Sequence, residues 1–70
     1  MSHGGWFFRL IEQDDGSWHF FRGLSLQSRH TTLDDARTRA VTMAEDYRPS
    51  TVFSHHLDGR IDTVATFAAE

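Results

Sequence analysis

The chain has 70 residues, a formal net charge of -3 at pH 7 and no cysteine. This length allows one small domain, and the absence of thiols excludes disulfides and every cysteine-based zinc motif. The excess of Asp and Glu over Arg disfavours attraction to nucleic-acid backbones, and no apolar run approaches the roughly 18 residues that a membrane helix needs. Because so small a core supplies limited stability, self-association is the expected support.

The first expected element is a β-hairpin. Two apolar, aromatic runs at residues 6–12 and 18–22 flank the pair Asp15-Gly16. An Asp-Gly pair in this setting is a strong hairpin signal, since Asp and Gly both tolerate the backbone conformations that a tight turn requires. Residues 24–30 then show a loose two-residue alternation, which fits either a third strand or a continuation past a bulge.

A helix is expected next, from Thr32 to Arg48. Thr32 precedes Asp35 by three residues, which is close to the capping-box pattern, and Pro49 follows the last helical position. Apolar residues recur at intervals of three and four, as on one face of a helix, at Leu33, Ala36, Ala40, Met43, Ala44 and Tyr47. The small alanines would let the helix lie close against a sheet.

A second hairpin closes the chain. Residues 51–56 and 61–67 are rich in β-branched and aromatic side chains and flank a second Asp-Gly pair. With a two-residue loop, the opposed pairs would be His56 with Ile61, His55 with Asp62, Ser54 with Thr63, Phe53 with Val64 and Val52 with Ala65.

Together these elements predict one α+β domain over residues 1–70, with flexible ends at residues 1–5 and 68–70. We expect two layers. One is an antiparallel sheet of four or five strands built from the two hairpins, and the other is a single helix on one face of that sheet.

Two family resemblances follow from these residues. Residues 18–67 resemble the family catalogued as domain of unknown function 2188, a family of short bacterial proteins, and this resemblance implies the same architecture with no assigned chemistry. Residues 6–47 are similar to the amino-terminal domain of HicB-type antitoxins, which implies a small toxin as partner. The first resemblance is carried by the strand opening at Trp18, the helix start Thr32-Leu33-Asp34-Asp35-Ala36 and the turn Asp58-Gly59-Arg60-Ile61.

Candidate catalytic and ligand-binding groups are sparse. His55 opposite Asp62 would be a carboxylate-oriented imidazole, as found in catalytic sites and behind metal ligands, although cross-strand pairs of this kind are more often structural. The serines lack a nucleophile-elbow context, and the glycines are not clustered as in a phosphate-binding loop. We therefore expect no enzymatic activity, no metal and no cofactor.

The expected binding site is one face of the sheet. Whether the first loop is counted as two residues or four, Ile11 faces Phe20 and Arg9 faces Arg22, so both arginines share a face with large apolar groups. One helix covers only one face, and burying two arginines without carboxylates is costly. The face turned away from the helix would then carry the binding residues Phe7, Arg9, Trp18, Phe20 and Arg22.

Such a face predicts a non-enzymatic binding or regulatory module. A cytoplasmic location with no membrane contact is expected because residues 1–5 show no basic region ahead of an apolar stretch and no apolar run is long enough to cross a bilayer. Packing of two such faces as a homodimer is the first interpretation, and docking of another protein with an acidic patch is the second. A single-stranded nucleic acid, stacked on the rings, is a third that the net charge disfavours. A small acidic inhibitor of the antitoxin kind also fits. Alternatively, a strongly twisted sheet would fold Trp18 or Phe7 into one ordinary core.

Overall fold

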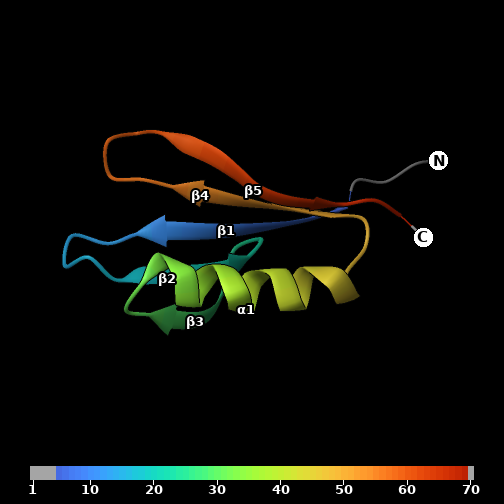
Figure 1. The fold of residues 1–70 in the computed structure, drawn as a ribbon, viewed down its shortest axis with the longest axis horizontal. Helices are drawn as coiled ribbons and strands as arrows, with labels where there is room; N and C mark the ends of the chain where they lie inside the picture. Colours follow the sequence, from blue (N-terminus) through green and yellow to red (C-terminus); the bar gives the residue numbers. More distant parts are fainter. Residues whose placement is uncertain (1–4, 70) are drawn as a thin grey trace.

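The computed structural model describes residues 5–69 and shows, within that range, one helix layered against a five-stranded sheet (Figure 1). The predicted two-layer α+β fold with one helix is confirmed. The predicted flexibility of residues 1–5 and 68–70 falls largely on positions 1–4 and 70, which lie outside the described residues. In chain order the elements are β1 (Trp6–Glu12), β2 (Trp18–Arg22), β3 (Ser25–His30), α1 (Leu33–Asp46), β4 (Ser50–His55) and β5 (Ile61–Phe67).

The sheet is mixed, with the strand order β3-β2-β1-β4-β5. Both hairpins and the β2–β3 pair are antiparallel, but β1 and β4 run parallel, side by side, at the centre. The expectation of an entirely antiparallel sheet is therefore wrong at this pair. The reason is that α1 carries the chain back across the sheet after β3, so β4 starts at the same end as β1 (Figure 1).

The segment after Gly23 is a separate third strand with a bulge of its own. Gly23 has a positive φ of 61° in the tight turn between β2 and β3, a conformation that favours glycine. The register shifts between Phe20 and Phe21, which leaves Gln27 as the extra residue of a β-bulge in β3. The interpretation of this segment as a third strand is confirmed, and the alternative of one strand that continues past a bulge at Gly23 is wrong.

Helix α1 packs an alanine stripe against the sheet. Ala36, Ala40 and Ala44 are fully buried, and α1 contacts all five strands. The small side chains allow this close approach, while Leu33, Met43 and Tyr47 pack around the stripe as predicted.

The ends of α1 follow local rules. The Thr32 Oγ1 accepts a hydrogen bond of 3.2 Å from the backbone N–H of Asp35, which confirms the predicted N-cap. The helix ends at Asp46, two residues before the predicted end at Arg48. A residue that precedes proline avoids the helical conformation, so Pro49 stops the helix earlier than expected.

The core lies between α1 and the three central strands. Phe8, Leu10, Phe20 and Val52 are fully buried there, and the Phe8 and Phe20 rings stack with their centroids 5.7 Å apart. Every buried side-chain nitrogen or oxygen of the described residues has a hydrogen-bond partner. Ser50, for example, donates to a carbonyl oxygen of α1 at 2.8 Å.

Both hairpins turn through the same three-residue loop. The glycine has a positive φ, 88° at Gly16 and 91° at Gly59, and its N–H donates to the carbonyl oxygen three residues earlier. The preceding aspartate, Asp15 or Asp58, accepts from the backbone N–H two residues later. This pattern matches a type I turn followed by a bulged glycine, the usual form of a three-residue hairpin loop.

The three-residue loop shifts the first hairpin by one residue from the predicted register. Arg9 pairs with Phe21 and Leu10 pairs with Phe20. An odd loop exchanges the two faces of the returning strand relative to the two- or four-residue loop that the prediction assumed. All β2 side chains therefore lie on the face opposite to the predicted one.

The second hairpin shows the same shift near its loop. His55 pairs with Ile61, whereas the prediction paired His55 with Asp62. Further along, Val52 pairs with Ala65 as predicted, because a bulge in β5 supplies the missing residue.

Candidate functional site

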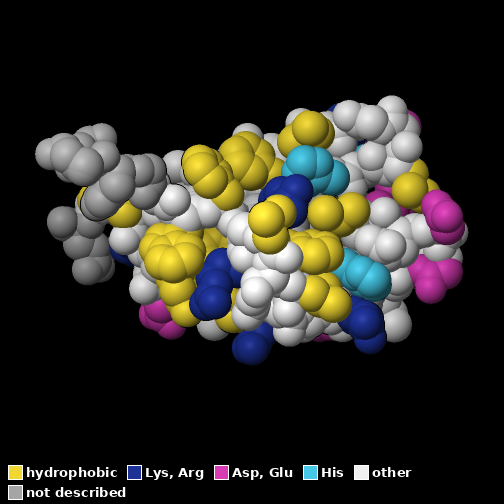
Figure 2. Space-filling view, turned by 180° about the vertical axis from the view of Figure 1, so that it is seen from behind, with side chains coloured by type: hydrophobic (Ala, Val, Ile, Leu, Met, Phe, Trp, Pro, Cys, Tyr) yellow, Lys and Arg dark blue, Asp and Glu magenta, His cyan; other side chains and the backbone are white. Residues whose placement is uncertain are grey.

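One face of the sheet is left uncovered by α1, and Figure 2 shows the molecule from that side. Hydrophobic side chains, arginines and histidines gather over it, and the acidic side chains in this view lie toward its margins. Side chains alternate along a strand, so the register defines this open face. The open face comprises Phe7, Arg9, Ile11, His19, Phe21, Leu26, Arg29, Thr51, Phe53, His55, Ile61, Thr63 and Thr66.

No Asp or Glu of residues 5–69 occupies a strand position on the open face. Glu12 pairs across the strands with Trp18, and Asp62 pairs with Ser54, so both carboxylates lie on the covered side. The other described carboxylates lie in the hairpin loops and in α1, at Asp14, Asp15, Asp58, Asp34, Asp35, Glu45 and Asp46. The described part of the open face thus combines large apolar groups, threonines and histidines with the cations of Arg9 and Arg29.

Ring contacts make the centre of the open face continuous. The Phe7 and Phe53 rings stack across β1 and β4 with centroids 6.1 Å apart. The Arg9 Nη2 donates to the Gly23 carbonyl oxygen at 2.9 Å, and its guanidinium carbon lies 5.7 Å from the centroid of the Phe21 ring. Arg9 is therefore held in a defined position above the sheet.

The predicted binding residues are divided between the two faces. Phe7 and Arg9 lie on the open face, as predicted. Trp18 and Phe20 are buried under α1, with 6% and 0% of their surface exposed, and Arg22 lies on the same covered side. Their predicted placement on the uncovered face is wrong because the first loop has three residues, and Trp18 joins the single core as the twisted-sheet alternative proposed.

Arg22 is accommodated under the helix by aromatic groups. Its Nη1 donates to the Tyr47 hydroxyl at 2.7 Å, and its guanidinium carbon lies 5.6 Å from the Trp6 ring centroid and 5.3 Å from that of Tyr47. Ring faces and a phenol thus stabilise this cation, and no carboxylate of residues 5–69 forms an ion pair with it. The sequence argument considered only carboxylate partners and therefore placed Arg22 on the wrong face.

Sequence reasoning missed Phe21, Phe53 and Ile61 as members of the open face. A signal for Phe21 was present, since Asp15-Gly16 also fits a three-residue loop with a left-handed glycine. That count places Phe21 beside Arg9. Ile61 needed the same correction at the second loop, whereas the face of Phe53, which precedes that loop, follows from the parallel pairing of β4 with β1.

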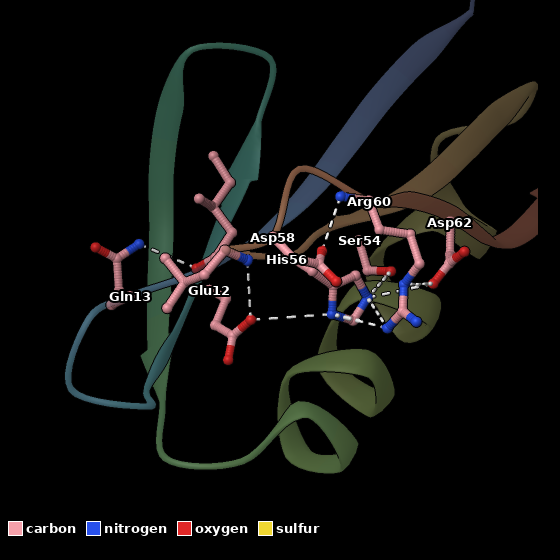
Figure 3. A network of polar contacts seen from close by, with 9 residues as sticks. Glu12, Gln13, Ser54, His56, Asp58, Arg60 and Asp62 are labelled. Carbon is pink, nitrogen blue, oxygen red and sulfur yellow. Dashed lines mark hydrogen bonds and ion pairs between the residues drawn. The ribbon is translucent and has the colours of Figure 1, made fainter.

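His56, and not His55, is the histidine beside Asp62 (Figure 3). Its Nε2 lies 3.3 Å from the Asp62 Oδ2 and 3.2 Å from the Ser54 Oγ. The predicted pairing of His55 with Asp62 is wrong because the three-residue loop places Asp62 opposite Ser54. Ser54 is only 2% exposed and is therefore buried.

The same cluster ties the second loop to β1. The Glu12 Oε1 lies 3.9 Å from the His56 Nδ1 and accepts a hydrogen bond of 3.0 Å from the Leu57 backbone N–H (Figure 3). The His56 ring meets the Trp18 ring edge to face at 5.2 Å. These contacts hold the second loop against β1 and β2, so the cluster stabilises the fold.

A second histidine, His30, links β3 to the start of α1. Its Nε2 lies 2.7 Å from the Ser28 Oγ, and its Nδ1 lies 2.8 Å from the Asp35 Oδ2. Because Asp35 belongs to the first turn of α1, this chain of contacts fastens the edge strand to the helix. Sequence reasoning assigned Asp35 to the cap alone and gave His30 no partner.

Comparisons with known proteins found no relative of this chain. No family model matches the chain, and no curated protein or solved structure matches it. Among residues 5–69, no three His, Asp or Glu side chains are grouped so as to hold a metal ion. Within the same range, no helix combines the length and the apolar character that crossing a bilayer requires. The two family resemblances stay predictions.

Proposed function

We propose that this protein is a non-enzymatic binding module that recognises another protein through the open face. The proposal rests on the composition of the described part of that face, which combines phenylalanine, isoleucine, leucine and arginine with no Asp, Glu, Ser or Ala. Protein interfaces are enriched in aromatic residues and arginine and depleted in those four types. Since the chain uses all four elsewhere, the bias belongs to this face.

Exposure of large apolar groups supports the same assignment. Phe7 is 55% exposed, Ile61 is 59% exposed and Leu26 is 42% exposed. Single exposed apolar residues are common on protein surfaces, but a contiguous apolar patch is typical of an interaction site. Phe7 stacks on Phe53, and Ile61 lines the same surface depression, so these apolar groups adjoin across β1, β4 and β5.

The polar clusters support a non-enzymatic role. The hydrogen bond between His30 and Asp35 connects β3 to α1, and His56 lies within ion-pair distance of Glu12 on β1 and Asp62 on β5. A cytoplasmic location belongs to this proposal as well.

Photo-crosslinking in the native host tests the proposed binding face. We expect p-benzoylphenylalanine at position 7 or 53 to give a discrete covalent adduct with a second protein, since both rings lie on the open face. The control is the same group at Thr38, an exposed residue of α1 on the opposite side of the molecule. Mass spectrometry of the adducts identifies the partner.

The outcomes separate the interpretations. No adduct at positions 7 and 53, or equal adducts at Thr38, would contradict a binding role for the open face. An adduct between two copies of the chain would identify the homodimer that the sequence predicts.

A further inference from the structure

The charges on the open face have one sign. Arg9 and Arg29 lie on it, and no carboxylate of residues 5–69 shares its strand positions. The whole chain nevertheless has a formal net charge of -3. The open face is therefore a basic area on an acidic protein, and it is complementary to a partner that brings negative charge.

Arg9 occupies the centre of this basic area. β1 is the middle strand of the described sheet, and Arg9 lies halfway along it. The Gly23 carbonyl and the Phe21 ring fix its guanidinium, but neither neutralises its charge. A partner that covered this face with apolar groups alone would bury an unpaired cation, which is costly.

A second copy of this chain does not supply the missing anion. Two open faces packed together would place both copies of Arg9 and Arg29 in one layer, and the described part of the face offers no Asp or Glu to either copy. Like charges placed together in an interface oppose association. Charge complementarity therefore favours a different protein over a homodimer through this face.

A shallow depression adjoins Arg9. It has a volume of about 430 Å³ and is lined by Phe7, Arg9, Phe53, His55 and Ile61. Apolar groups thus lie next to a fixed guanidinium. Interfaces use such depressions for apolar anchor side chains, and arginine pairs with carboxylates through two parallel hydrogen bonds.

We infer, on the basis of the proposed function, that the partner is a different protein that presents an apolar side chain beside a carboxylate. The apolar side chain lies against Phe7, Phe53 and Ile61, and the carboxylate pairs with Arg9. This arrangement neutralises the central cation and covers the most exposed apolar groups of the open face at the same time.

Random dodecapeptides displayed on phage test this inference on the full chain. We expect selection to enrich Asp or Glu next to Phe, Leu or Ile. A synthetic, fluorescein-labelled peptide of the selected consensus should then lose at least about tenfold in affinity with Arg9→Gln, since one partner of a covered charge pair is removed. Arg39→Gln, a matched change of an exposed arginine on α1, should alter affinity by less than about twofold.

A double-mutant cycle locates the carboxylate. Replacing the peptide carboxylate by its amide should weaken binding to the unmodified protein as much as Arg9→Gln does. The same replacement should have no further effect on the Arg9→Gln variant, because the two groups act as one pair. Circular dichroism of each variant confirms that it is folded.

Other results would overturn the inference in distinguishable ways. Peptides that lose binding with Phe53→Ser but carry no enriched carboxylate would refute the partner chemistry and leave the proposed function intact. No selected peptide, or peptides indifferent to Phe53→Ser, would remove both. Preferential binding of a labelled oligothymidylate that weakens steeply with salt would assign the face to single-stranded nucleic acid. A dimer in sedimentation equilibrium that Phe53→Ser dissociates would assign it to a second copy.

Discussion

The two faces of this sheet are built from the same strands, but the arginines on them differ in the partners that the fold provides. On the covered face, Arg22 donates to Tyr47 and lies against two rings, so the fold itself provides its partners. On the open face, Arg9 has one carbonyl, one ring and no carboxylate among the described residues. The covered face thus completes its interactions within the chain. The open face leaves an arginine without a carboxylate, and large apolar groups exposed, among residues 5–69.

The neighbours Phe20 and Phe21 provide the sharpest test of this comparison and the largest expected effect on stability. Phe20 is fully buried under α1, whereas Phe21 lies partly exposed on the open face. Phe20→Ala should lower the free energy of unfolding by about 3–5 kcal/mol, because it leaves a cavity in the core. Phe21→Ala should lower it by about 1 kcal/mol or less. Urea unfolding followed by circular dichroism measures both.

A loss of about 3–5 kcal/mol is comparable to the whole stability of a domain this small. Phe20→Leu serves as the second variant if Phe20→Ala does not fold, since it retains much of the buried volume. Equal losses for Phe20→Leu and Phe21→Leu would contradict the assignment of the two faces.

The limits of sequence prediction here are set by the two turns. The strands at residues 6–12, 18–22 and 61–67 and the buried stripe of α1 were predictable, because alternation and helical periodicity are local patterns. An Asp-Gly pair signals a hairpin but fits loops of two, three or four residues. One residue of loop length moves every side chain of the returning strand to the other face.

This sensitivity explains the outcome for the binding site. Phe7 and Arg9 precede the first loop, and their face was predicted correctly. Trp18, Phe20 and Arg22 follow it and were assigned to the wrong face. The parallel pairing of β1 with β4 could not be predicted either, since no local sequence pattern indicates which strands of separate hairpins become neighbours.

Substitutions at the loop glycines have the next largest expected effect. An added Cβ at Gly16 or Gly59 meets nothing within 4 Å, so the cost of Gly→Ala is confined to the positive φ. Each change should lower the free energy of unfolding by about 1–2 kcal/mol, and Gly→Asn should cost less because asparagine accepts this conformation. Equal costs for Ala and Asn in urea unfolding would contradict the three-residue loop that assigns residues to the two faces.

The smallest expected effect is on the acid dependence of stability, through Asp15 in the first loop, and it should leave binding unchanged. Hydrogen bonds from the Ser17 hydroxyl at 2.6 Å and, second, from the Ser17 backbone N–H at 2.9 Å lower the pKa of Asp15. A carboxyl whose pKa is lowered by folding stabilises the protein above its unfolded pKa of about 3.9, and that contribution is lost as the pH falls through the folded value. Stability measured by urea unfolding between pH 6 and pH 2.5 should therefore fall less steeply with acid in Asp15→Asn and in Ser17→Ala than in the unmodified protein.

Since Asp15 lies in a loop outside the open face, Asp15→Asn should leave binding of the selected peptide at pH 7 unchanged. An unaltered acid dependence would contradict the stabilising role of the Ser17 contacts, and weakened binding would extend the binding face into the loop.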